Sequence, residues 1–150
     1  MQAALIEARK AYSEGEVPVG AVMVIENQVI AADHNRTEQW HDPLAHAEML
    51  VIRSACAKRQ YERLSAAAVY VTVEPCVMCA GALLLARIRQ LIYGAANPKA
   101  GAISSLYTLA QDLRLNHQIE VITGVLQAEC AHLMTSFFQQ LRTGEVPKRS

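Results

Sequence analysis

Two short stretches carry the residues whose chemistry stands out: His46 and Glu48 in HAE, and Cys76 and Cys79 in PCVMC. Cysteines three positions apart place both sulfurs on one face of a helix, and a helix N-terminus favours the thiolate form that binds metal. One imidazole and two thiolates are a ligand set typical of zinc. Three protein ligands leave a fourth position for water, as catalytic zinc sites do, whereas structural sites close all four positions.

Each of these signals has a simpler interpretation when it is taken alone. A single CxxC pair occurs in redox proteins or as a chance pairing of core cysteines, and a single histidine is more often a core or surface residue than a ligand. An acid in the first turn of a helix, such as Glu48, is favoured by the helix dipole. The combination of histidine, glutamate and CxxC is specific, and it favours the metal site.

The ligands can meet only if the elements that carry them start at the same edge of a sheet. Hydrophobic periodicity predicts strands at 19–25, 28–33, 67–73, 90–95 and 119–125, and helices at 2–14, 45–59, 76–88 and 127–142. A tight hairpin turn is expected at Glu26-Asn27, and loops at 35–43 and 97–105. A hairpin followed by βαβ units predicts a three-layer αβα fold, with a mixed five-stranded sheet and helices on both faces.

The same pattern predicts which residues face the core. The strand at 67–73 is a near-continuous apolar run, as expected for a strand covered on both faces. The stripes expected to face the core are Leu5, Ala8 and Tyr12 in the first helix, and Met49, Ile52 and Cys56 in the helix at 45–59.

Composition restricts the class of protein. With 150 residues, 52 % of them hydrophobic and 19 % charged, the chain is expected to form one domain, 1–150, with a substantial core. Lysine plus arginine and aspartate plus glutamate number 14 each, so the net charge is zero, which argues against non-specific binding of long duplexes. We find no signal peptide, no membrane-spanning run and too few cysteines for a secreted disulfide framework, and therefore expect a cytoplasmic protein.

The sequence resembles the zinc-dependent nucleoside and nucleobase deaminases of the cytidine deaminase-like superfamily, which carry H-x-E followed by P-C-x-x-C. Along nearly its whole length it is similar to the bacterial tRNA-specific adenosine deaminases. The matching stretches are EVPVGAV (16–22), HNR (34–36), HDPLAHAE (41–48), YVTVEPCVMCAGAL (70–83), GAANPKAGA (94–102) and the FF pair at 137–138. The whole superfamily shares HAE and PCxMC, whereas VPVGA, PCVMCAGA and NPKAGA point to the tRNA-acting branch.

The resemblance implies hydrolytic deamination of adenosine to inosine at the wobble position of a tRNA anticodon. His46, Cys76 and Cys79 would hold one zinc ion per subunit, and the water that it activates would attack adenine C6. Glu48 would take a proton from the water, pass it to adenine N1 and later protonate the departing ammonia. The resemblance also implies a homodimer in which both chains shape each site for the tRNA anticodon arm.

The same resemblance assigns residues to the substrate. Asn35 would hydrogen-bond the nucleoside, and the backbone N–H of Ala47 would contact the base edge. An apolar wall is expected from Val17, Pro18 and Val19, and RNA contacts are expected from Asn97, Lys99, Phe138 and Arg142, with Phe137, Lys148 and Arg149 as further candidates. From residue type alone, Asn35 would be a turn residue, one phenylalanine a core residue and the C-terminal cations part of a solvated tail.

Two features depart from the family pattern. Asn97 stands where the family usually has aspartate, which replaces a pure acceptor by a group that both donates and accepts and removes a charge. We therefore hypothesise weaker discrimination between RNA and single-stranded DNA. The segment QQLR (139–142) is less basic than is usual for the C-terminal helix of the family, which leaves the extent of tRNA contact open.

Two other functions share much of this pattern. A deaminase of guanine or of a cytosine nucleoside or nucleotide would use the same zinc chemistry and the same DPxAHAE motif. The loop NPKAGA and the C-terminal helix favour the tRNA substrate instead. A non-catalytic zinc module, serving as an RNA-binding or partner subunit, is the third possibility, but such a scaffold has no need for a proton shuttle at Glu48.

Overall fold

A computed structural model describes residues 1–145, so Lys148 and Arg149 lie outside the described residues. The helices are α1 (Gln2–Ser13), α2 (Thr37–Trp40), α3 (Ala47–Arg59), α4 (Val77–Leu85) and α5 (Gln127–Thr143), with a short 3₁₀ helix η1 (Leu109–Gln111). The strands are β1 (Gly20–Ile25), β2 (Gln28–His34), β3 (Ala68–Val73), β4 (Gln90–Ala95) and β5 (Glu120–Ile122).

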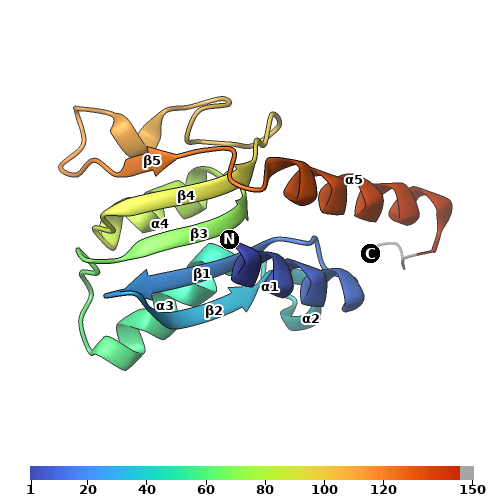
Figure 1. Ribbon diagram of the computed structural model, residues 1–150, viewed down its shortest axis with the longest axis horizontal. Helices are drawn as coiled ribbons and strands as arrows, with labels where there is room; N and C mark the ends of the chain where they lie inside the picture. Colours follow the sequence, from blue (N-terminus) through green and yellow to red (C-terminus); the bar gives the residue numbers. More distant parts are fainter. Residues whose placement is uncertain (146–150) are drawn as a thin grey trace.

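The strands form one five-stranded sheet in the order β2-β1-β3-β4-β5. β1 runs antiparallel to β2 and β3, whereas β3, β4 and β5 are parallel. Helices α3 and α4 lie behind the sheet in Figure 1, and α1 lies in front of it, with α5 extending beyond one end. The predicted three-layer αβα fold with a mixed sheet is confirmed.

Local sequence explains how the sheet begins. Glu26 and Asn27 both have positive φ, at 50° and 61°, as a two-residue type I′ hairpin requires. At the start of β1, α1 packs so closely that a Cβ on Gly20 would lie 2.1 Å from the carbonyl oxygen of Ala4. Gly20 is therefore needed for the close contact between α1 and the sheet. No helix of residues 1–145 is both long and apolar enough to cross a membrane.

The core-facing stripe of α3 differs from the prediction by one position. Its fully buried residues include Ala47, Val51 and Ala55, whereas the expected Met49, Ile52 and Cys56 are only partly buried. The stripe repeats every four residues, and its two alanines, Ala47 and Ala55, bring the helix backbone close to the sheet, so the larger side chains lie at the sides of the contact. In α1, Leu5 and Ala8 are buried as predicted, whereas Tyr12 is partly exposed.

Three boundaries also differ from expectation. The segment expected to be a loop at 35–43 contains the short helix α2, whose first N–H groups donate to the buried carboxylate of Glu16. The helix expected at 76–88 ends earlier because Arg87 has positive φ. The last strand, expected at 119–125, is limited to Glu120–Ile122 at the edge of the sheet, where it has one neighbouring strand.

Candidate functional site

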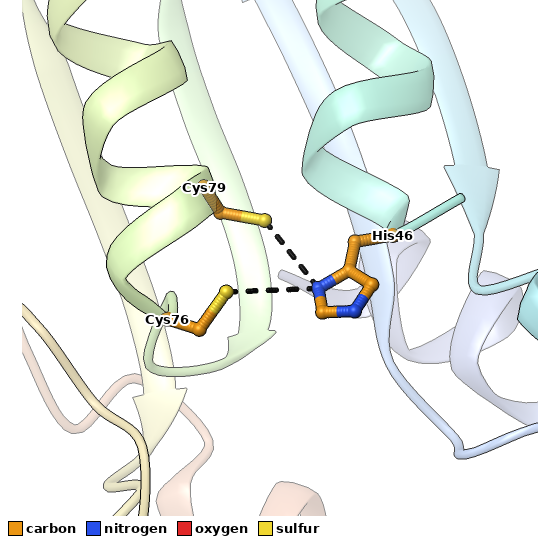
Figure 2. A group of neighbouring side chains, drawn as sticks. All are labelled: His46, Cys76 and Cys79. Carbon is orange, nitrogen blue, oxygen red and sulfur yellow. Dashed lines mark hydrogen bonds between the residues drawn. The ribbon is translucent and has the colours of Figure 1, made fainter. Parts of the chain in front are cut away.

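The three proposed ligands meet where two helices begin. His46 precedes the first residue of α3, Cys76 precedes the first residue of α4, and Cys79 lies in the first turn of α4. His46 Nδ1 is 3.7 Å from Cys76 Sγ and 3.6 Å from Cys79 Sγ, and all three side chains point toward one another (Figure 2). The predicted meeting of the two helix starts is therefore present, next to the carboxyl end of β3.

The arrangement fits a tetrahedral zinc ion. With Zn–S bonds of about 2.3 Å and Zn–N bonds of about 2.0 Å, tetrahedral angles place nitrogen and sulfur about 3.5 Å apart. The three ligand atoms all lie within 4.8 Å of one another. Hydrogen bonding with Cys79 lowers the pKa of Cys76 to about 4, despite the opposing effect of burial. The cluster thus offers a thiolate and an imidazole at distances that one zinc ion can bridge.

A second group of potential ligands, Glu7, Asp33 and His34, lies at the end of β2. Its polar atoms already have protein partners: the two ring nitrogens of His34 lie 2.8 Å from Glu7 and 2.9 Å from Glu14. Arg36 donates to Asp33 at 2.9 Å. This network ties α1 to the end of β2, immediately before Asn35.

Glu48 lies in the first turn of α3 and is only 3 % exposed. Burial raises its pKa from the ordinary value of 4.5 to about 6, which brings its proton exchange close to neutral pH. A carboxyl group with such a pKa can both accept and release a proton during a reaction at neutral pH. His46 also has a raised pKa, chiefly because of its hydrogen bond with Cys76.

The raised pKa of Glu48 predicts a pH dependence of stability in the metal-free protein. The folded state holds the proton more tightly than the unfolded chain, so stability is lost as pH rises from about 4.5 through 6. Glu48→Gln, which stays neutral, should therefore be more stable than wild type at pH 7 by about 2 kcal/mol, with no difference near pH 4. Urea unfolding of both chelator-treated proteins at the two pH values measures this effect, and equal stabilities at pH 7 would contradict it.

Asn35 and Ala47 are joined to each other. Asn35 is buried at the end of β2, and its Oδ1 accepts the backbone N–H of Ala47 at 2.9 Å. Asn35 therefore caps the start of α3 from another element. The backbone N–H of Ala47 was expected to contact the base edge. In this structure it donates to Asn35.

A cavity of about 750 Å³ opens beside His46, Glu48 and Cys76. Among the residues predicted to contact substrate, it is lined by Val17, Val19, Asn35, Asn97, Lys99, Phe138 and Arg142. The cavity is also lined by residues that have no role predicted from the sequence: Thr37, Glu74, Ala131, Met134 and Thr135. The cavity therefore extends from the ligand cluster to α5.

Two of the expected wall and stacking residues are placed differently. Pro18 is buried and is not among the residues that line the cavity, whereas its neighbours Val17 and Val19 are. The N–H of Val19 donates to the carbonyl oxygen of Val17 at 2.7 Å, so Pro18 is the central residue of a tight turn before β1. Phe137 is fully buried and packs edge-on against Tyr12 and Phe138, so it is the core member of the pair.

Glu74 is the most important residue that the sequence analysis left without a role. It is 2 % exposed and follows β3, and its carboxylate accepts backbone N–H groups of Asn97, Ile103, Ser104 and Ser105. Burial alone would raise the pKa of Glu74, but these hydrogen bonds hold it below the ordinary value. The sequence does contain a signal that could have identified Glu74: a glutamate directly follows a strand whose apolar run predicts that it is buried.

The family profile and the relatives that match this chain are all deaminases. The profile of the MafB19-like deaminase family matches residues 1–142. A tRNA-specific adenosine deaminase of Bacillus subtilis is 49 % identical over 142 residues, which cover 95 % of this chain and 88 % of that one. One from Agrobacterium fabrum is 46 % identical over 142 residues, covering 95 % and 93 %.

Solved structures show the same likeness. A structure from a study of A-to-I editing by tRNA:A34 deaminases at the wobble position superposes with a TM-score of 0.86 at 47 % identity, covering 89 % of this chain and 96 % of that one. A guanine deaminase from Nitrosomonas europaea superposes with a TM-score of 0.75 at 28 % identity, covering 89 % and 80 %. The likeness in sequence is thus greater to the structure from the tRNA study than to the guanine deaminase.

Proposed function

Since the chain belongs to the MafB19-like deaminase family and matches tRNA-specific adenosine deaminases along 95 % of its length, we propose that it converts adenosine to inosine in transfer RNA, at the wobble position of the anticodon. The observation that carries this proposal is the convergence of His46, Cys76 and Cys79 beside the buried acid Glu48, in a cavity large enough for a nucleoside. The structural likeness to a guanine deaminase makes a small purine base another candidate substrate, and the lower sequence identity to that enzyme ranks it second.

The residues of the chain have distinct parts in this reaction. A zinc ion held by His46, Cys76 and Cys79, one per subunit, would supply a water molecule of lowered pKa for attack at adenine C6. Glu48 would accept one proton from the attacking water on its carboxylate and deliver it to adenine N1. It would then take the second proton, from the hydroxyl group now on C6, and pass it to the amino nitrogen, so ammonia departs and inosine remains. One carboxyl group serves both steps because it returns each proton that it has taken.

The cavity walls would hold the base and the RNA around it. Val17 and Val19 provide apolar surface, and Asn35 presents its amide beside the start of α3. Ala47 remains a candidate for contact with the base edge through its N–H, which it would share with Asn35. Lys99, Arg142 and Phe138 also line the cavity. The two cations would meet phosphates, and Phe138 would stack on an unpaired base. Asn97 lies in the same loop as Lys99.

The assembly and location follow from the same proposal. We infer a homodimer, supported by exposed apolar side chains on α4, where Val77 is 51 % and Leu85 is 81 % exposed. The partner would be the anticodon arm of tRNA, and the place of action the cytoplasm, where tRNA is found. Residues 1–150 would form a single zinc-dependent deaminase domain.

The decisive experiment uses an anticodon stem-loop with the anticodon ACG. Zinc-loaded protein should convert its wobble adenosine to inosine, read by sequencing or nucleoside mass spectrometry. Guanine and cytidine are tested in parallel as substrates of the alternative function. Conversion of guanine or cytidine without conversion of the stem-loop would replace the proposed substrate, and a zinc-loaded protein inactive on all three would favour the non-catalytic module.

Asn35→Ala is expected to lower kcat/KM on the stem-loop by about 10- to 100-fold. The substitution removes both the proposed nucleoside contact and the acceptor for the Ala47 N–H. Asn35→Asp is the matched control, because it keeps an acceptor for that N–H but lacks the amide donor. An unchanged kcat/KM in the alanine variant would refute the assignment of Asn35 to the substrate.

Asn97→Asp tests the hypothesis on sugar discrimination. Oδ1 of Asn97 accepts the N–H of Ala100 at 3.2 Å, and an aspartate can accept the same bond, so the loop should keep its shape. We expect the ratio of activity on RNA to activity on a single-stranded DNA loop to rise about 2- to 10-fold in the variant. Competition between the two substrates measures the ratio, and the hypothesis fails if the ratio is the same in both proteins.

A further inference from the structure

The carboxylate of Glu74 is the centre of a hydrogen-bond cluster that involves one segment of the chain. We call residues 97–105 the rim loop. The N–H groups of Ile103, Ser104 and Ser105 donate to Oε1 at 3.1, 2.7 and 2.8 Å. The N–H of Asn97 donates to Oε2 at 3.0 Å, and the hydroxyl of Ser105 donates to the same oxygen. Both ends of the rim loop are thus bound by a single side chain.

The rest of the rim loop is built around this carboxylate. Val73 pairs with Ala95 in the parallel ladder, which brings the residues that follow β3 and β4 together. A Cβ on Gly101 would lie 2.4 Å from the carboxyl carbon of Glu74 and 2.6 Å from the carbonyl oxygen of Asn97. A glycine is therefore required where the loop passes the acid.

The part of the rim loop between its two attachment points faces the cavity. Asn97, Pro98, Lys99 and Ala100 line the cavity, and Lys99 is exposed. Glu74 borders the same cavity, but both of its oxygens accept donors from the rim loop. Its effect on a ligand must therefore pass through the shape of the loop.

We propose that Glu74 is a positioning residue that holds the rim loop in the shape that receives RNA, so that it determines substrate binding and not proton transfer. The inference rests on the proposed function, because it names the RNA as the ligand of the rim loop. Loop residues held in one conformation need no ordering when RNA binds, and this preorganisation favours affinity.

Glu74→Gln is the sharpest variant because it removes the acceptor of the Asn97 N–H, whereas the Ser105 hydroxyl, which bonds the same oxygen, can rotate and accept from an amide NH₂ group. The oxygen of the amide can still accept the three N–H groups of residues 103–105, but the NH₂ group would face the N–H of Asn97, and two donors cannot bond. Gly101→Ala disturbs the same contact from the other side. Val69→Ala is the control for a general loss of stability, because Val69 is fully buried near the start of β3, at the end remote from Glu74.

The experiment combines three readouts on zinc-loaded protein. For Glu74→Gln and Gly101→Ala we expect faster trypsin cleavage after Lys99, followed by mass spectrometry, with zinc content unchanged. On the stem-loop, KM should rise about 10- to 100-fold while kcat changes by less than about threefold. Val69→Ala should keep the wild-type KM and the wild-type cleavage rate after Lys99.

Each outcome supports or overturns the proposal. A fall in kcat with an unchanged KM, or a KM increase of equal size in Val69→Ala, would show that Glu74 does not act through RNA binding. Unchanged cleavage after Lys99 in both loop variants would show that the acid does not hold the loop. Failure of the proposed function is recognised separately, because the wild-type protein would then leave the stem-loop unconverted while the proteolysis result stands.

Discussion

Glu48→Ala is expected to retain zinc and to lose deamination, with kcat on the stem-loop reduced about 1,000-fold or more. Glu48 is the buried acid beside the ligand cluster, and in the proposed reaction it moves every proton between water, base and leaving nitrogen. Without it, each transfer would depend on water, which is a much weaker acid and base than a positioned carboxyl group. Initial rates and bound zinc, measured on the same preparation, check both parts of the expectation.

Glu48→Gln separates the chemistry from the packing. The amide has nearly the volume of the carboxyl group, so the variant keeps the contacts of the fully buried side chain but cannot exchange a proton. We expect its activity loss to match that of Glu48→Ala. Substantial activity in either variant, with zinc bound, would overturn the role assigned to Glu48.

Cys79→Ser is expected to lower zinc affinity at least about 100-fold, and activity with it. Cys79 is fully buried and lies 3.6 Å from the ligand nitrogen of His46, so its sulfur completes the set of three. A hydroxyl group is a much weaker zinc ligand than a thiolate. Competition with a zinc-binding dye measures the affinity.

Cys56→Ser is the matched control for this loss. Cys56 is a free, partly buried cysteine outside the ligand cluster. Its substitution should leave zinc content and activity at the wild-type level. In addition, zinc should raise the melting temperature of wild type and of Cys56→Ser but not of Cys79→Ser. The reason is that added zinc stabilises the folded state only of a protein that binds it. Equal zinc affinity in the two cysteine variants would contradict the proposed ligand set.

The architecture and the ligand cluster were predictable because their signals are local. The alternation of strands and helices fixes the class of fold, and the spacing of Cys76 and Cys79 places both sulfurs on one helix face. His46 could be joined to them on the condition that both helices start at the same edge of the sheet, which the structure fulfils. Two of these three ligands are separated by only one helical turn.

Other features could not be predicted because they depend on contacts between distant segments. The core stripe of α3 is displaced toward Ala47 and Val51 because the sheet accepts small residues at close range, which periodicity alone does not encode. Helix α2 is short and depends on Glu16, which is more than 20 residues away in sequence. The position of Glu74 directly after a buried strand could have marked it as important, but its partners could not be predicted because they lie in another loop.

The separation of the proposed metal ligands along the chain has a consequence for how the protein would mature. His46 and Cys79 are 33 positions apart, and the strand β3 lies between them in sequence. In the unfolded chain, bringing the imidazole to the two cysteines would cost the entropy of closing a long loop. With this ligand set, high-affinity metal capture would follow assembly of β3 between β1 and β4, so a newly made chain would acquire its metal only after its sheet has formed.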